Sequence, residues 1–96
     1  MRRHIVLISF NPEANEEERE AVKAAVRGFA EAIPEVRALT CGDNVGKGPN
    51  HHDFAMVAEF DDMAAFRRDT QSPAHQGYVA GPAKAVAKLA AIQHEW

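Results

Sequence analysis

Residues 3–10 read RHIVLISF, and this stretch decides the fold. Branched and large apolar side chains dominate it, which favours a β-strand. Successive side chains of a strand point to opposite faces, and both of the resulting sets are apolar here, namely Ile5 with Leu7 and Val6 with Ile8. Apolar side chains on both faces predict a strand that is covered on both sides.

The segment DFAMVAEF at residues 53–60 has the same character, with Phe54 and Met56 on one side and Ala55 and Val57 on the other. Helices and further strands are indicated around these two segments by capping residues, apolar spacing and Pro or Gly breaks. The expected elements are a strand over 3–10, a helix over 15–33, a strand over 36–41, a loop over 42–52, a strand over 53–60, a helix from Asp61 or Asp62, a new helical start at Ser72-Pro73, a short helical piece from Ala83, and a strand over 88–96.

This order, β-α-β-β-α-β, predicts an α+β, ferredoxin-like domain with an antiparallel sheet that spans residues 1–96. Right-handed crossovers place both helical segments on one face of the sheet. The other face is then apolar and uncovered, and such a face is rarely left in water. We therefore expect a homodimer that packs sheet against sheet as a dimeric α/β barrel. A monomer with a ligand or a membrane on that face is the alternative.

Composition excludes several classes of protein. The chain has 96 residues, a net charge of −3 and 46% hydrophobic residues, which is ordinary for a globular domain and unlike a basic nucleic-acid-binding surface. The apolar start is too short for a signal peptide, and no stretch reaches transmembrane length. The only cysteine, Cys41, suits a reducing compartment. We expect a cytoplasmic protein without nucleic-acid or membrane partners.

Four segments carry a resemblance to one family. Residues 3–8 resemble the K-H-I-V-L-F start of stress-responsive A/B barrel (Dabb) proteins, and 53–60 resembles their third strand. Residues 72–79, SPAHQGYV, resemble the motif H-P-A-H-Q-x-F/Y-V, and 33–36 resembles an I-P-G-V corner. By this resemblance the chain is identified as a Dabb member. The resemblance implies a homodimeric α/β barrel with a cavity between sheet and helices or in the barrel centre.

The resemblance does not imply one activity. A plant polyketide cyclase of the family closes a linear polyketide by an aldol reaction, with a histidine as base. That histidine matches His75, and a second histidine matches His4. A tyrosine of the enzyme falls at Asp69 in an ungapped match, and another of its histidines falls at Phe54. Half of the polar set of that enzyme is therefore missing.

Three residues are candidates for catalysis. A neutral imidazole at His75 can accept a proton from an acidic carbon, since the ordinary pKa of histidine lies near neutrality. His4 can donate a hydrogen bond to a carbonyl group in the same pocket, and Tyr78 can supply a phenol. The structural alternatives are that His75 bonds the backbone at a helix corner, that a neighbour satisfies His4, and that Tyr78 is core.

Other polar residues are interpreted as structural. Asp69 is expected on the helix surface beside Arg67 and Arg68, with orientation of His75 as the alternative. The adjacent His51 and His52 chelate one ion poorly, because neighbours in a strand point to opposite faces. We expect neither a metal nor a cofactor, although some relatives are reported to carry a divalent ion near the dimer interface.

The sequence thus predicts a Dabb protein of unassigned activity, with an apolar pocket for a small hydrophobic ligand. The first alternative is a polyketide cyclase or a lyase-type enzyme that uses His75 as general base. The second alternative is a cofactor-free monooxygenase of the dimeric α/β barrel superfamily. The Asn, Trp and His set of those enzymes is not placed here, since Trp96 is the last residue.

Overall fold

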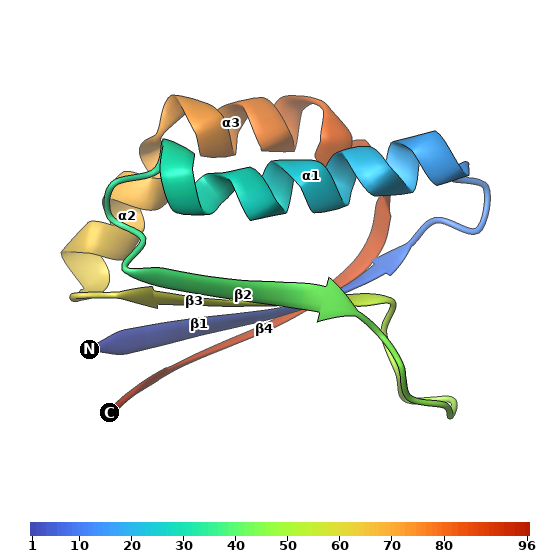
Figure 1. Cartoon of the computed structure of the whole chain (residues 1–96), viewed down its shortest axis with the longest axis horizontal. Coiled ribbons are helices and arrows are strands. Elements are labelled where there is room, and N and C mark those ends of the chain that lie inside the picture. Colours follow the sequence, from blue (N-terminus) through green and yellow to red (C-terminus); the bar gives the residue numbers. More distant parts are fainter.

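The computed structural model describes residues 1–96 and confirms the α+β, ferredoxin-like order (Figure 1). Three helices pack on one face of a four-stranded sheet, and the C-terminal strand follows a short 3-10 helix. The elements are β1 (Arg2–Phe10), α1 (Glu16–Ala32), β2 (Ala38–Asp43), β3 (Phe54–Phe60), α2 (Met63–Gln71), α3 (Pro73–Ala80), η1 (Pro82–Ala85) and β4 (Val86–Glu95).

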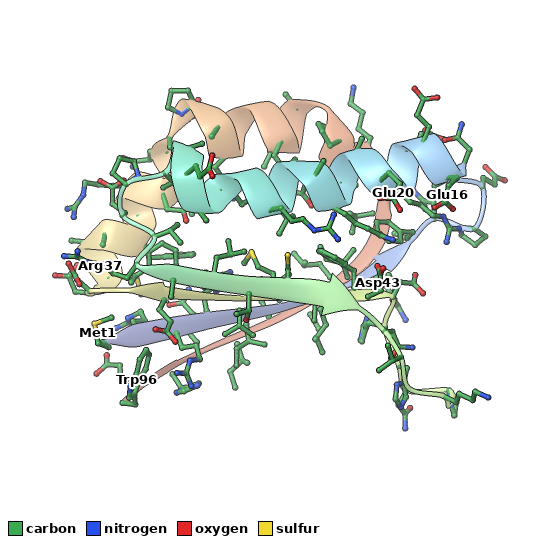
Figure 2. The ribbon with its side chains drawn as sticks, in the orientation of Figure 1. Met1, Glu16, Glu20, Arg37, Asp43 and Trp96 are labelled. Atoms are coloured by element: carbon green, nitrogen blue, oxygen red, sulfur yellow. The ribbon has the colours of Figure 1, made fainter.

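The strands lie in the order β2-β3-β1-β4, and every neighbouring pair is antiparallel. β1 is central, as its apolar faces predict, and it pairs with β3 on one side and with β4 on the other. The first and last residues meet at one end of the sheet, where the Trp96 N–H donates to the Met1 carbonyl at 3.3 Å. Figure 2 shows both of these residues there, with Glu20 and Asp43 at the opposite end.

Local chemistry explains where α1 begins and which face it buries. The Asn15 side chain accepts a hydrogen bond from the Glu18 N–H, and the Glu18 carboxylate accepts one from the Asn15 N–H. This capping box satisfies donors that the helix itself leaves free. Val22, Val26 and Phe29 then recur on one side of α1 and are buried against the sheet. None of the helices is both long and apolar enough to cross a membrane.

Several strand boundaries differ from the sequence-based expectation, and β2 runs to Asp43 rather than to 41, so that the loop after it is shorter than expected. The starts of β2 and β4 also differ, for local reasons. β2 begins at Ala38 rather than at 36, because the Val36 N–H donates to the Ile33 carbonyl and keeps this segment in a turn. β4 begins at Val86 rather than at 88, because η1 ends at Ala85 and Val86 already pairs with Phe10. The new helical start expected at Ser72-Pro73 is confirmed. α2 ends at Gln71, and Ser72 caps α3, which has Pro73 at its first position.

The two faces of the sheet have different environments. The face under the helices holds the core, which includes Phe54 and Met56. The other face has no cover in the chain, as Figure 1 shows. In register, it presents one row of Val57, Ile5 and Ile92 and a second row of Ala55, Leu7 and Ala90. We call these six residues the outer face. Leu7 is 36% exposed and Ile92 is 61% exposed.

Candidate functional site

A cavity of about 390 Å³ lies between the inner face of the sheet and helices α1 and α3. Fifteen of its nineteen lining residues are hydrophobic, and the others are His4, Asp69, His75 and Lys88. The first three of these, together with Tyr78, form the polar end that is discussed below. The lining consists of His4, Val6, Ile8, Val26, Phe29, Val36, Leu39, Met56, Ala58, Phe66, Asp69, His75, Tyr78, Val79, Ala83, Val86, Ala87, Lys88 and Leu89. Its size and apolar character are typical of small-molecule pockets.

His4 reaches the cavity from the central strand. It lies between Ala58 and Gln93 in the sheet register, and its ring packs on Phe66 with 4.8 Å between centroids. Its Nδ1 atom is buried and has no hydrogen-bond partner in the protein, so the expectation that a neighbour satisfies this histidine was wrong. Burial, and secondarily the charge of His75, lower the pKa of His4. The imidazole is therefore held neutral, with an unused polar atom.

His75 is the third residue of α3, and the Ser72 cap determines its position. Its main-chain N–H donates to Ser72 Oγ at 3.2 Å, which satisfies one free donor of the helix start. The imidazole itself packs between aromatic rings, 6.0 Å from Phe29 and 6.4 Å from Tyr78 between centroids. The backbone hydrogen bond at this corner uses the main chain of His75, which leaves the ring free to face the cavity.

Tyr78 lies one turn further along α3. Its ring meets Phe29 edge to face at 5.5 Å, and burial raises the pKa of its phenol. The phenol is therefore protonated and able to donate a hydrogen bond. The three residues singled out from the sequence come from β1 and α3, and the fold brings all of them to one cavity.

Asp69 is a fourth polar residue of this cavity, and its expected place on the helix surface was wrong. It is 7% exposed and is the only buried charged residue of the chain. Burial raises the pKa of its carboxyl group, the charge of His75 lowers it, and Glu35 raises it further. The sequence did contain a signal, because Asp69 follows the inward-facing Ala65 and Phe66 at spacings of four and three.

The sequence matches the model of one protein family, the stress-responsive A/B barrel domain (Dabb), over residues 3–95. The chain belongs to the Dabb family. A dimeric ferredoxin-like protein of unknown function from Thermobifida fusca is 30% identical with a TM-score of 0.85, over 99% of this Dabb chain and 90% of that one. An uncharacterized protein of Streptomyces coelicolor is 33% identical over 82 residues, which are 83% of this chain and 84% of that protein.

A solved plant structure shares the fold of this Dabb chain. Hydroxynitrile lyase from Passiflora edulis superimposes with a TM-score of 0.84, over 97% of this chain and 90% of that one. At 18% identity this likeness concerns the fold alone.

The other polar residues singled out from the sequence do not line the cavity. His52 Nδ1 is 2.9 Å from Ser9 Oγ, and Asp53 Oδ2 accepts a hydrogen bond from the Phe10 N–H at 2.8 Å. These contacts tie the long loop to the end of β1. Trp96 lies outside the cavity as well, with the Arg3 guanidinium 4.1 Å from its ring centroid.

The polar end of the Dabb cavity thus combines four groups of different chemistry. Neutral His4 and protonated Tyr78 can donate hydrogen bonds to a ligand oxygen, while His75 can accept a proton. Apart from Lys88, the remaining walls are apolar, which favours contact with the apolar part of a small compound. Such a site suits a small compound with an apolar body and one oxygen function.

Proposed function

We propose that this Dabb chain is a homodimer and that the outer face is its interface. Polar groups border the six apolar residues at both ends, with the Arg3–Glu59 ion pair at 3.0 Å on one side and the Ser9–His52 contact on the other. An apolar centre with a polar rim is the usual anatomy of a protein interface. The relatives from Thermobifida fusca and Bacteroides fragilis, both described as dimeric, support this assignment.

We further propose that residues 1–96 form one domain that works in the cytoplasm. A single hydrophobic core of fourteen buried residues connects the sheet with α1, α2 and η1. The one cysteine, Cys41, is free, which agrees with a reducing compartment.

We propose that the cavity binds a small hydrophobic ligand that carries an oxygen function. The observation that carries this proposal is the convergence of His4, His75 and Tyr78 on one apolar cavity. A water molecule occupies about 30 Å³ in the liquid, so the cavity has the volume of about 13 waters. A single ring with a short polar substituent fits this space.

Titration with acetophenone, followed by amide chemical shifts, tests ligand binding. Val79 lines the cavity and is 55% exposed, so Val79→Trp places an indole at the entrance without disturbing a buried position. Val45→Trp is the matched control, because Val45 is 96% exposed and lies outside the cavity. We expect Val79→Trp to weaken binding at least about tenfold, a cost of about 1.4 kcal/mol. Equal affinity in both variants, or no binding at all, would contradict the proposal.

A second candidate function is catalysis by His75 as general base, in a lyase or a polyketide cyclase. Its support is the pairing of a ring free to accept a proton with the donors His4 and Tyr78, together with the lyase found among proteins of this fold. In the lyase reaction, His75 takes the hydroxyl proton of a hydroxynitrile. The oxygen forms the carbonyl, the bond to the nitrile carbon breaks, and cyanide leaves with that electron pair and regains a proton. The same base would remove a carbon-bound proton in an aldol cyclisation.

Cyanide release from mandelonitrile, together with a screen of β-dicarbonyl compounds, tests this second candidate. His75→Ala should lower turnover by about 10²- to 10⁴-fold while the protein stays folded. His94→Ala is the control, since His94 is exposed on β4 and outside the cavity. Equal turnover in both variants would sink the role of His75. For a cofactor-free monooxygenase no observation adds support, because Trp96 does not line the cavity.

A further inference from the structure

Lys88 is the one lysine or arginine in the lining of the cavity, and the functions above do not use it. The residue is exposed, and it takes part in none of the ion pairs of the chain. A lysine carries a compact positive charge on a flexible four-carbon stem. Such a charge beside an apolar cavity can bind a negative group of a ligand.

A β-bulge explains why Lys88 lines the cavity. Strict alternation along β4 would place it on the uncovered side of the sheet, since its neighbour Leu89 lies on the helix side. The register of β4 against β1 shifts between Ser9 and Phe10, which leaves one extra residue in β4. Lys88 pairs with Ser9, directly beside this bulge. Bulges bend a strand and re-aim its side chains, and Figure 1 shows the start of β4 curving toward the helices.

Lys88 and the polar groups lie at opposite ends of the cavity. On β1, the register partner of Lys88 is Ser9, five residues beyond His4. At a rise of about 3.4 Å per residue, the main chains at these two positions are about 17 Å apart. The side chains of His4 and Lys88 shorten the gap, and the apolar Val6 and Ile8 line the cavity between them. A ligand that contacts both ends therefore has a polar group at each end of an apolar body.

The segment around the entrance carries no negative side chain. Residues 70–94 cover α3, η1 and most of β4, and they include two lysines and no aspartate or glutamate. The exposed Val79 and Leu89 at the entrance belong to this segment. The one acid of the lining, Asp69, lies on α2, where the charge of His75 acts on it. Although the whole chain has a net charge of −3, the entrance thus attracts a negative group.

We propose that the cavity binds an apolar carboxylic acid and that Lys88 determines this specificity by binding the carboxylate at the entrance. The proposal rests on the proposed function and names the class of ligand that the cavity takes. The oxygen function at the other end of the ligand lies against His4, His75 and Tyr78. One lysine balances a single negative charge, which matches a carboxylate, whereas a phosphate is typically bound by several donors or by a helix N-terminus.

A matched pair of ligands tests the role of Lys88. The acid para-acetylbenzoate carries a ketone and a carboxylate at opposite ends of one ring, and para-acetylbenzamide has nearly the same shape without the charge. In titrations followed by backbone chemical shifts, we expect the wild type to bind the acid about fivefold more tightly, the upper end for an exposed ion pair. Lys88→Gln should bind both compounds equally, and Lys88→Arg should keep the preference.

Lys84→Gln is the matched control. Lys84 is exposed on η1 and takes part in no ion pair, but it does not line the cavity. This variant should keep the preference for the acid, and an equal loss in Lys84→Gln and Lys88→Gln would overturn the specific role of Lys88. Added salt should weaken binding of the acid and leave binding of the benzamide unchanged, because salt screens exposed charges.

The titrations separate the two proposals. If the wild type binds acid and benzamide equally, if Lys88→Gln keeps the preference, or if acetophenone alone binds, the role of Lys88 is refuted and ligand binding stands. If none of the three compounds binds, the proposed function fails, and the specificity assigned to Lys88 fails with it.

Discussion

Ile92 provides the sharpest test of the dimer, because β4 offers a matched control three residues away. Ile92 is 61% exposed and Leu89 is 63% exposed in one protomer. Ile92 pairs with Ile5 on the outer face, whereas Leu89 pairs with Ile8 on the helix side and lines the cavity. The two residues therefore lie on opposite faces of the same strand. Their exposed fractions are nearly equal, and both side chains are branched and aliphatic.

The expected magnitude follows from the area that remains to be covered. Complete burial of an isoleucine side chain stabilises by about 1.5–3 kcal/mol, so covering the exposed 61% of Ile92 is worth about 1–2 kcal/mol. Two-fold symmetry places this residue in the interface twice. Ile92→Ala should therefore cost about 2–4 kcal/mol per dimer and raise the dimer Kd about 30- to 1,000-fold.

Sedimentation equilibrium over a dilution series measures the Kd directly. Leu89→Ala should leave the Kd within about threefold of the wild type, since a truncation on the helix side removes no interface area. Equal weakening by Ile92→Ala and Leu89→Ala, or no effect of Ile92→Ala on the Kd, would show that the outer face is not the interface.

Three further outcomes concern stability and pH. Phe54 is 1% exposed in the core, so Phe54→Ala should lower the free energy of unfolding by about 3–5 kcal/mol in urea titrations; a loss below 1 kcal/mol would contradict its place in the core. The pKa of His4 lies below the ordinary 6.5, so the unfolded chain binds protons more readily and the free energy of unfolding should fall as pH drops below 6.5. His4→Gln should reduce this fall between pH 7.5 and 5.5, and the same change at the exposed His94 should not. The pKa of Asp69 is raised, so its burial lowers stability as pH rises above the ordinary 3.8, and this loss is complete once pH exceeds the folded pKa. Asp69→Asn should therefore raise the urea midpoint more at neutral pH than at about pH 3, and a lowered midpoint at neutral pH would refute this.

The face that each strand residue occupies was predictable, because alternation needs no knowledge of the partner. Phe54 and Met56 share the buried face of β3, while Val57 shares the outer face, as the sequence pattern requires. The ends of the strands were less predictable. Val36 is apolar and β-branched, yet its N–H bonds to the Ile33 carbonyl in a turn, which is a matter of local geometry that composition does not report.

The polar end of the cavity was only partly predictable. His4 and His75 were found through their motifs, but the unpartnered Nδ1 of His4 depends on Ala58, Phe66 and Gln93, which are distant in sequence. Asp69 was misjudged because the surrounding residues are polar and suggest a solvated surface. Asp69 nevertheless lies four residues after the buried Ala65, and side chains four residues apart share a face of a helix. Its position in the helix therefore predicts burial better than the polar character of its neighbours predicts exposure.

The energetics of the cavity support the proposal that the chain binds a ligand there. At about 24 cal/mol per Å³, a dry void of 390 Å³ would cost about 9 kcal/mol, which is comparable with the whole stability of a domain. The residues around it include Ala58, Ala83 and Ala87, where larger side chains would fill the space. Its entrance, near the exposed Val79 and Leu89, admits solvent. Water can satisfy the polar end, but it gains nothing from the apolar walls. A ligand with an apolar body and one oxygen function would satisfy both the polar end and the apolar walls, and this difference is the physical basis of the proposed binding.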